Sequence, residues 1–294
     1  MRIKSFAKIN LGIEVLGKRD DGYHEIRTLF QSVDLFDLLD FFPCTQDEII
    51  LIGDDDSILW DESNLVNQAA TLLKERHAIK KGMEIHVKKN IPAGKGLGGG
   101  SSNAAMTLLA LNKMWQINLE KNALKDLGAQ IGADVPFFFE GGLCLGQGKG
   151  DILFQQEDPS PLLCLLVFPS VSVSTESAYE RFRASLTSQS KESKIIKFLN
   201  SHDLGFLEND LEEIVFRTYP QIKAIKSLIQ EQGSELTLMS GSGSAVFGLF
   251  DQRNKAMNAL RVLSNEYTAV LTTTLSQTEY QERIRIGVSR QTGV

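Results

Sequence analysis

The stretch PAGKGLGGGSSNAA, Pro92–Ala105, contains five glycines and two serines and runs directly into an alanine- and leucine-rich segment. Glycines allow several backbone N–H groups to approach one anion closely, and the first turn of a following helix adds unpaired donors and a partial positive charge. The stretch therefore predicts a phosphate-binding loop. A tight turn that binds no ligand is the alternative for the loop taken by itself.

The residues on either side of this loop predict a strand before it and a helix after it. Apolar Met83, Ile85 and Val87 alternate with polar residues, which is typical of a strand. Beyond the loop, Ser101 or Ser102 is expected to cap a helix. Apolar residues then recur at helical period, at Ala104, Leu108, Leu111 and Trp115.

The commoner phosphate loops do not fit. The Walker pattern needs a serine or threonine after its lysine, but Lys95 and Lys149 are each followed by glycine. A dinucleotide fingerprint is matched by Gly94, Gly96 and Gly99, yet that pattern is weak without its strand-helix-strand unit and a following acidic residue. The loop therefore calls for a different phosphate-binding architecture.

Bulk composition excludes several classes of protein. The 294 residues are 42% hydrophobic, enough for one large domain or two of ordinary size. A net charge of -6 and the lack of a basic stretch argue against binding nucleic acid or anionic membranes. No apolar run approaches the ~18 residues of a membrane span. Lys8 lies where a signal peptide needs an apolar core, so we expect a cytoplasmic protein.

The cysteines and histidines do not predict a metal site. Cys44, Cys144 and Cys164 are far apart and form no C-x-x-C pair, so we expect them to be small buried hydrophobes. The four histidines form no pair at i, i+4. The sequence therefore predicts no metal bound by protein ligands alone.

The order of elements predicts an α+β fold in two domains. Residues 2–17 alternate as a half-buried strand whose polar face carries Lys8 and Asn10 side by side. A polar segment with two prolines near 155–161 is the expected boundary between domains 1–156 and 157–294. The other elements expected in the first domain are strands in 24–42, where a helix is the alternative, and 47–53, a helix from Ser63 or Asn64, a helix ending at Ile131 before Gly132, a strand from Val135, and a hairpin turning at 148–151.

The second domain is expected to alternate strands and helices as well. We expect strands at 162–168 and 267–274, a strand-loop-strand unit at 235–250, helices at 174–186 and 254–264, and one or two helices in 210–233. The last residues, 289–294, are expected to be frayed. No internal repeat or low-complexity segment occurs.

Three separated stretches resemble the three motifs of the GHMP small-molecule kinases, in the same order. They are AKINLGIEV at 7–15, the glycine loop, and MSGSGSAVFGLF at 239–250. DGYHEI at 21–26 and IGADVPFF at 131–138 are similar to those members that phosphorylate a cytidine-diphosphate-linked methylerythritol in the non-mevalonate pathway of isoprenoid synthesis. The resemblance spans nearly the whole chain.

This resemblance implies a fold, a reaction and small-molecule substrates. The fold would combine an N-terminal domain like the second domain of ribosomal protein S5 with a ferredoxin-like C-terminal domain. The reaction would transfer the γ-phosphoryl group of ATP, with Mg²⁺, to a 2-hydroxyl group. Neither the resemblance nor the pattern predicts the oligomeric state.

The resemblance also implies the catalytic pair and the ATP site. Asp134 would be the catalytic base and Lys8 its partner, whereas by themselves they could be a turn-capping aspartate and a solvated strand lysine. The side chain of Lys95 could add charge to the loop or point to solvent, and Asn64 could be simply an N-cap. The residues implied to bind ATP are Asn64, Leu65, Pro92, Gly94, Lys95, Gly96, Gly98, Gly99, Gly100, Ser101 and Ser102.

The acceptor is implied to bind through a cytosine clamp. Tyr23 and Tyr179 would stack on the two faces of the base, and His24 would contact its edge. Thr175 lies near Tyr179 in sequence, and Asn10 would contact the base or the methylerythritol. Residues 240–244, SGSGS, would shape the site from the second domain, although a plain hairpin turn is the alternative.

Other functions remain possible on these motifs. A homoserine, mevalonate or sugar kinase would share the ATP-binding residues. Its acceptor site would not need the cytosine clamp that DGYHEI is implied to provide. A non-catalytic ligand-binding protein of the same fold would not need both Lys8 and Asp134. A nucleic-acid role would need a basic face, which the acidic balance does not support.

Overall fold

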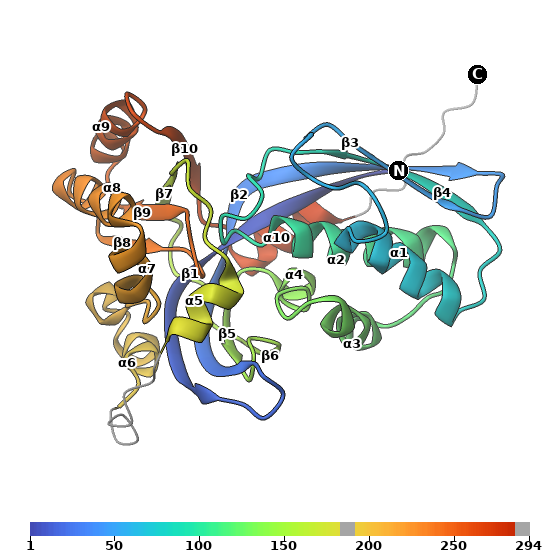
Figure 1. Ribbon diagram of the computed structural model, residues 1–294, viewed down its shortest axis with the longest axis horizontal. Helices are drawn as coiled ribbons and strands as arrows, with labels where there is room; N and C mark the ends of the chain where they lie inside the picture. The colour runs from blue at the N-terminus through green and yellow to red at the C-terminus, as the bar shows by residue number, and fades with distance from the viewer. Residues whose placement is uncertain (183–191, 286–294) are drawn as a thin grey trace.

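Two long antiparallel strands, β1 (Arg2–Lys18) and β2 (His24–Cys44), run through the first half of the computed structural model, which describes residues 1–182 and 192–285 (Figure 1). β1 is buried along most of its length and β2 along its first half, where both faces of the pair are covered, whereas the end of β2 alternates between buried and more exposed residues. β1 is therefore more buried than the half-buried strand that we expected, and Lys8 and Asn10 on its polar face are buried as well. The segment 24–42 is strand throughout.

β2 is the centre of the first sheet. It pairs with β1 along one edge and with both β4 and β5 along the other. The hairpin predicted to turn at 148–151 is confirmed by the antiparallel pair β5 and β6. The remaining strands of this sheet are β3 (Ile49–Gly53), β4 (Gly82–Lys88), β5 (Leu143–Gln147) and β6 (Ile152–Gln155).

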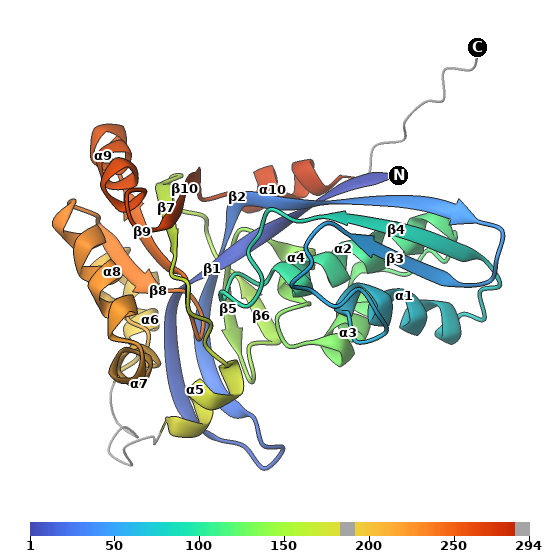
Figure 2. The same cartoon turned by 45° about the horizontal axis from the view of Figure 1, so that its top comes forward.

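A layer of helices covers one face of this sheet (Figure 2). They are α1 (Leu65–Arg76), α2 (Gly99–Met114), α3 (Lys121–Ile131) and α4 (Phe137–Glu140). The side chain of Asn64 caps α1 by accepting a hydrogen bond from the Val66 amide at 3.0 Å, as predicted. The predicted apolar stripes of α1 and α2 are buried at Val66, Ala69, Ala70, Leu73, Ala104, Leu108, Leu111 and Trp115.

Two local predictions in this layer are wrong. The cap of α2 is Gly98, in the left-handed conformation, so Ser101 and Ser102 lie inside the first turn of the helix. The strand expected from Val135 is instead a turn and the short helix α4, with Pro136 in helical conformation at φ −56° and ψ −33°. A short apolar run cannot be assigned to strand or helix by periodicity alone, and every side chain of this run is buried.

The second sheet has the strand order β10-β7-β9-β8 and is antiparallel throughout. Its strands, β7 (Leu163–Phe168), β8 (Leu236–Met239), β9 (Val246–Phe250) and β10 (Thr268–Thr273), are connected in the β-α-β-β-α-β order of a ferredoxin-like domain. The predicted strand-loop-strand unit is β8 and β9. The fold is therefore α+β, as expected.

Helices α5, α7, α8 and α9 of the second half lie where they were predicted, whereas α6 and the 3₁₀-helix η1 were not predicted. The segment 210–233 forms two helices, because Pro220 begins the second one. Of the predicted helix 174–186, the residues beyond 182 lie outside the described part of the chain, as does the tail 289–294. The elements are α5 (Thr175–Arg181), α6 (Lys194–Ser201), the 3₁₀-helix η1 (Leu204–Phe206), α7 (Glu212–Thr218), α8 (Pro220–Glu231) and α9 (Arg253–Leu263).

The two halves share an apolar core. Alternate residues of β7 point to opposite faces, so Cys164 and Leu166 pack toward β1 and β2, whereas Leu165 and Val167 pack on α8 and α9. The cluster on the first face combines side chains of β1, β2, β7 and β9. The two halves are thus packed against each other through one continuous apolar cluster. The division of the chain into domains 1–156 and 157–294 stays a prediction.

The last described helix, α10 (Gln277–Ile284), returns to the first half and was not predicted from the sequence. Its buried Tyr280 packs on Phe6, with ring centroids 5.7 Å apart, and donates a hydrogen bond to the Phe138 carbonyl at 2.7 Å. Ser276 and Glu279 close its first turn with a capping box. Helix α10 thus completes the apolar core of the first half.

Candidate active site

The glycine loop is shaped for close backbone contact. Gly94, Gly96 and Gly98 all have positive φ, a conformation that other residues rarely adopt. A Cβ atom on Gly96 would lie 2.1 Å from the Ser240 carbonyl oxygen, and one on Gly98 would lie 2.7 Å from the Phe138 ring. The loop can therefore reach its position only with bare backbone, directly before the N-terminus of the 16-residue helix α2.

Lys8 lies beneath this loop. Its backbone amide donates to the Leu97 carbonyl at 3.0 Å, which docks the loop onto β1. Its ammonium lies 3.3 Å from a carboxylate oxygen of Asp134 and donates to Asn10 Oδ1 at 2.6 Å. Asn10 is held in turn by Thr28, whose hydroxyl accepts from its Nδ2 at 2.7 Å. The predicted pair of Lys8 and Asp134 is formed, and Asn10 orients its cation.

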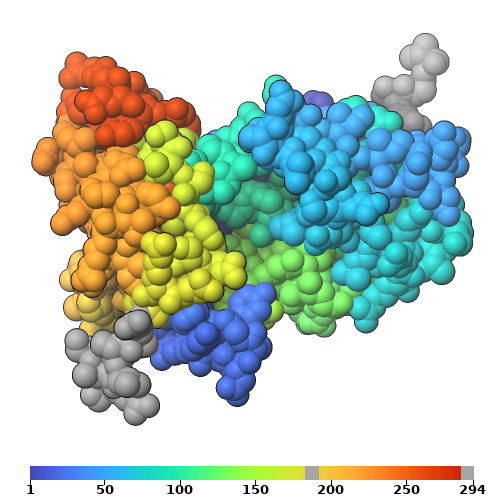
Figure 3. Space-filling view, viewed as in Figure 1, coloured from blue at the N-terminus to red at the C-terminus, as the bar shows by residue number. Residues whose placement is uncertain are grey.

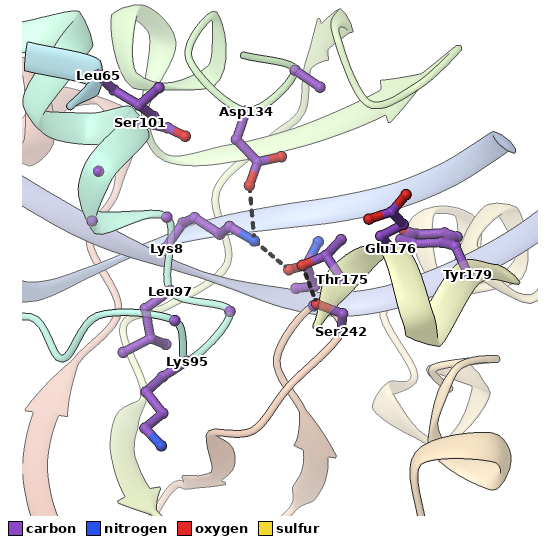
Figure 4. Close-up of a pocket in the computed structure, with 18 of the residues that line it drawn as sticks. Lys8, Leu65, Lys95, Leu97, Ser101, Asp134, Thr175, Glu176, Tyr179 and Ser242 are labelled. Atoms are coloured by element: carbon purple, nitrogen blue, oxygen red, sulfur yellow. Dashed lines mark hydrogen bonds and ion pairs between the residues drawn. The ribbon is translucent and has the colours of Figure 1, made fainter. Parts of the chain in front are cut away.

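Burial distinguishes the two members of this pair. The Lys8 side chain is 4% exposed, whereas the Asp134 side chain is 34% exposed. Asp134 lies in the turn between Gly132, which ends α3, and α4, so its carboxylate projects into the cavity from the helix layer (Figure 4). A carboxylate that a solute can reach, beside a fixed ammonium, suits it to accept a proton from a bound hydroxyl group.

These groups line one cavity of about 910 Å³ between the two halves of the molecule. Figure 3 shows the surface hollowed between the α5 segment and the helices of the first half. A cavity of this size, at the upper end of the usual range for small-molecule sites, has room for two substrates together. In Figure 4, Leu65 and Ser101 lie on one side of the Lys8 and Asp134 pair, and Glu176 and Tyr179 lie on the other.

The side of the cavity near α1 combines apolar and polar groups. Leu65 and Asn64 line it as predicted, together with Ile58 and Trp60 from the preceding loop. Asn64 is also the cap of α1, which was its alternative role, and its contact with ATP stays a prediction. This part of the cavity offers flat apolar contact, which a purine ring would fill.

A buried carboxylate that the sequence analysis missed supports the loop from behind. Asp37 is fully buried on β2 and accepts from the backbone amides of Asn90 and Ile91 at 2.7 and 2.8 Å. It also accepts from Asn103 Nδ2 at 3.0 Å and pairs with the Lys89 ammonium. Lys89 itself lines the cavity, and a Cβ atom on Gly99 would lie 3.3 Å from its ammonium. Asp37 thus holds a cation beside the first residue of α2.

At the opposite side, His24 and Tyr179 form a ring pair. Their centroids are 5.3 Å apart and their planes are inclined by 31°. Burial lowers the pKa of His24, and the charge of Lys18 lowers it further, so the ring is neutral at pH 7. Burial, followed by the Asp134 carboxylate, raises the pKa of Tyr179, which keeps its hydroxyl group protonated.

Tyr23 and Thr175 also line this side of the cavity. Tyr23 is 54% exposed, and the Lys149 ammonium lies 5.0 Å from its ring centroid. Thr175 shares a 2.7 Å hydrogen bond between hydroxyl groups with Ser242. Ser242 and Gly241 line the cavity, so the segment 240–244 does shape the site from the second half. Tyr23 and Tyr179 both line the cavity, and their predicted stacking on the two faces of a base stays a prediction.

Two residues assigned to the ATP site do not lie as predicted. The Ser102 hydroxyl group is buried against Ser5, at 2.7 Å, and is not part of the cavity lining, because the helix turns it toward β1. Lys95 is half-buried and lines the cavity, so its side chain is neither laid along the bare glycines nor fully exposed to solvent. Its ammonium donates to the carbonyls of Pro169 and Val171 at 2.9 and 2.6 Å and points away from Asp134 in Figure 4.

The remaining predicted residues line the cavity, and several more were missed. Pro92, Gly94, Gly96, Gly98, Gly99, Gly100 and Ser101 are present as expected. The lining residues that sequence reasoning missed include Lys18, Ile58, Trp60, Lys89, Asn103, Lys149 and Glu176. Their sequence neighbourhoods carry no pattern. Asp37, which supports the loop from behind, does carry a signal, because it shares the inward parity of Leu39 and Phe41 and so places a carboxylate on an apolar strand face.

Other groups on the molecule bear on metals and membranes. Within residues 1–182 and 192–285, no cluster of three His, Cys, Asp or Glu side chains could hold a metal ion. Cys144 and Cys164 are buried as expected, whereas Cys44 is only half-buried. None of the described helices combines the length and apolar character that crossing a membrane requires.

Comparison with known proteins gives a consistent result. The model for the GHMP kinases N terminal domain matches residues 64–142, and that for the GHMP kinases C terminal matches residues 192–269. A 4-diphosphocytidyl-2-C-methyl-D-erythritol kinase of Thermodesulfovibrio yellowstonii is 42% identical, over 92% of this chain and 96% of its own. One of the same name from Caldicellulosiruptor bescii is 38% identical, over 93% and 98%.

Solved structures agree in fold. A crystal structure of 4-(cytidine 5'-diphospho)-2C-methyl-D-erythritol kinase superposes with a TM-score of 0.81 at 33% identity, covering 93% of this chain and 99% of that one. A homoserine kinase from Cytophaga hutchinsonii gives a TM-score of 0.72 at 19% identity, over 94% and 95%. The second likeness concerns the fold alone.

Proposed function

Because this chain belongs to the GHMP kinase family, we infer that it transfers the γ-phosphoryl group of ATP to the 2-hydroxyl of 4-diphosphocytidyl-2-C-methyl-D-erythritol. One observation carries this inference. A single cavity runs from the glycine loop to α5, and the Lys8 and Asp134 pair lies in its middle, where two substrates would meet. The reaction belongs to the non-mevalonate pathway of isoprenoid synthesis.

Asp134 is the proposed catalytic base and Lys8 its partner. The acceptor oxygen forms a bond to the γ-phosphorus while the bond from that phosphorus to the β,γ-bridging oxygen breaks and ADP leaves. The hydroxyl proton passes to Asp134. The Lys8 ammonium stabilises the negative charge that develops on the acceptor oxygen, and Asn10 keeps that ammonium in place.

The nucleotide would occupy the side of the cavity near α1. The adenine ring would lie against Leu65 and Trp60, beside Asn64. Its phosphates would meet the backbone amides of the glycine loop and of the first turn of α2, whose partial positive charge favours anions. Lys89 would supply a full positive charge there, held in position by Asp37.

Mg²⁺ would accompany the phosphates. Mg²⁺ binds chiefly through substrate phosphates and water, with few protein ligands. The groups present fit such an ion, because the Ser101 hydroxyl lines the cavity and Asn103 Oδ1 is buried there without a hydrogen-bond partner among the described residues. When bound, the ion would neutralise charge on the β- and γ-phosphates.

The acceptor would occupy the side near α5. Tyr179, backed by His24, offers a flat face for cytosine, and Tyr23 offers a second ring at the exposed rim of the cavity. Thr175 lies at the start of α5, on the path toward the diphosphate. We place the enzyme in the cytoplasm with small molecules as its partners, as the sequence predicts.

An ADP-release assay with Mg·ATP tests the function. Four alcohols are compared: 4-diphosphocytidyl-methylerythritol, methylerythritol 4-phosphate, mevalonate and homoserine. Saturable turnover with the cytidyl compound alone supports the proposal. Turnover with another alcohol retains a kinase and rejects the cytosine clamp, and silence with all four despite ATP binding favours a non-catalytic binding protein.

Asp134→Ala tests the catalytic assignment. We expect turnover to fall at least ~10²-fold, the range for removal of a general base, with the KM for ATP nearly unchanged. Steady-state kinetics with the cytidyl acceptor measures both. Asp126→Ala, at an exposed position on α3, is the matched control and should keep full turnover. Comparable turnover in the two variants would reject Asp134 as the base.

A further inference from the structure

Lys95 links the glycine loop to the segment that carries the acceptor helix. Residues 169–174 connect β7 to α5 without regular structure. The Lys95 ammonium donates to two carbonyls of this segment, those of Pro169 and Val171, at 2.9 and 2.6 Å. Thr175 and Tyr179, at the acceptor side of the cavity, follow directly on α5.

The second half of the molecule closes this link from another side. The Ser244 hydroxyl group also donates to the Val171 carbonyl, at 2.6 Å. The Ala245 amide donates to the Lys95 carbonyl at 3.2 Å, and the Ser240 hydroxyl donates to the Gly96 carbonyl at 2.9 Å. Loop, segment and the 240–244 turn therefore meet at Lys95.

The environment of the Lys95 ammonium suits a structural link. Among the described residues, no carboxylate pairs with it, so its partners are carbonyl dipoles. Burial lowers its pKa, which reflects an ammonium withdrawn from solvent into this junction. A lysine placed to bind phosphate would instead extend toward the bare side of the loop.

We propose that Lys95 is a positioning residue that couples the two substrate sites. When ATP binds, the glycine loop is held in one conformation. The hydrogen bonds from Lys95 then hold residues 169–174 in one position, and this positions α5 to bind the acceptor. Each substrate therefore binds more tightly when the other is present, because both contact segments joined by the same side chain. This inference rests on the proposed function.

Three variants test it. Lys95→Met keeps the length of the side chain and removes the donor, and Lys95→Arg restores donors to the same carbonyls. Lys74→Met is the matched control, since Lys74 also donates to a backbone carbonyl, that of Asp47, at 2.8 Å, and does not line the cavity. If the Met variant does not fold, Lys95→Gln replaces it.

Calorimetry measures the affinity for the cytidyl acceptor with and without a non-hydrolysable ATP analogue. We expect the analogue to tighten acceptor binding at least about fivefold in the wild type, the lower end of usual coupling between sites. The ratio should fall toward one in Lys95→Met and recover in Lys95→Arg, with Lys74→Met unchanged. A loss of packing alone would lower the thermal midpoint and leave this ratio intact.

Other results overturn the inference. A wild-type ratio of one, or a ratio unaffected by Lys95→Met, removes the coupling. A Met variant whose defect is confined to the KM for ATP shows that Lys95 serves the phosphates instead. Turnover of the wild type in the same preparation distinguishes failure of the proposed function from failure of this inference. If the wild type shows no turnover, the proposed function is rejected. If it turns over normally and Lys95→Met leaves the ratio of acceptor affinities unchanged, only the role of Lys95 is rejected.

Discussion

At the scale of single residues, burial and one charged neighbour lower the pKa of His24. Burial of the ring is the larger cause of its lowered pKa, and the Lys18 ammonium is the second. The folded protein therefore resists protonation at His24 more than the unfolded chain does. The stability associated with the neutral ring is complete above the ordinary pKa of about 6.5 and is lost as pH falls below it.

Lys18→Met tests this account. We expect the pKa of His24 to rise, because one nearby positive charge is gone, while remaining below its ordinary value, because the burial persists. NMR titration of the imidazole protons measures it directly. Lys223→Met, at an exposed position of α8, should leave the titration unchanged. An equal or lower pKa in Lys18→Met would contradict the assignment.

Single residues also show where sequence reasoning reaches its limit. Asn64 and Asp134 could be assigned because a cap and a motif are local patterns. Ser101 and Ser102 could not be told apart, since the helix start at Gly98 decides which hydroxyl faces the cavity. The role of Lys95 depends on carbonyls 74 and 76 positions away along the chain, for which no local pattern exists.

At the scale of elements, the start of α2 requires glycine at position 98 but not at position 100. Gly98 has φ +70°, and a Cβ atom there would lie 2.7 Å from Phe138 and 3.2 Å from Lys8 side-chain carbons. At Gly100 the nearest atom, on Leu65, would lie 3.6 Å away, an ordinary contact. A side chain is therefore excluded at Gly98 and can be accommodated at Gly100.

We expect Gly98→Ala to lose about 1–2 kcal/mol from the left-handed conformation alone, and more from the contact with Phe138. Gly100→Ala should be neutral or stabilising, by up to about 1 kcal/mol, because alanine favours the helix. Urea unfolding followed by circular dichroism gives both values. Equal unfolding free energies for the two variants would show that the helix does not begin as described.

Elements with regular periods could be predicted well. The strands β1 and β4 and the helices α1 and α2 alternate or repeat in ways that indicate their buried faces. The short helix α4 and the final helix α10 could not, because the first is an unbroken apolar run and the second gains its place from Tyr280 and Ile284 packing against the distant first half. Tertiary contacts decided both.

At the scale of the whole molecule, α10 ties the chain end to the first core. Tyr280→Phe keeps the ring against Phe6 and removes the hydrogen bond to the Phe138 carbonyl. We expect it to cost about 1–3 kcal/mol, since a buried acceptor loses its donor. Tyr267→Phe, at a half-buried position, should cost less. Urea unfolding gives the free energy of unfolding of each variant. An unchanged value for Tyr280→Phe would contradict a stabilising role for the hydrogen bond to Phe138.

β1 contributes to all three apolar clusters, and this has a consequence for how the protein is made. Phe6 meets Tyr280 of α10, Ile9 lies in the cluster that contains β7 and β9, and Ile13 lies in the one that contains α8. Synthesis on the ribosome proceeds from the N-terminus, so β1 can pair with β2 early, before the strands and helices of the second half exist. Ile9 and Ile13 reach their final packing only after β7, β9 and α8 have been synthesised.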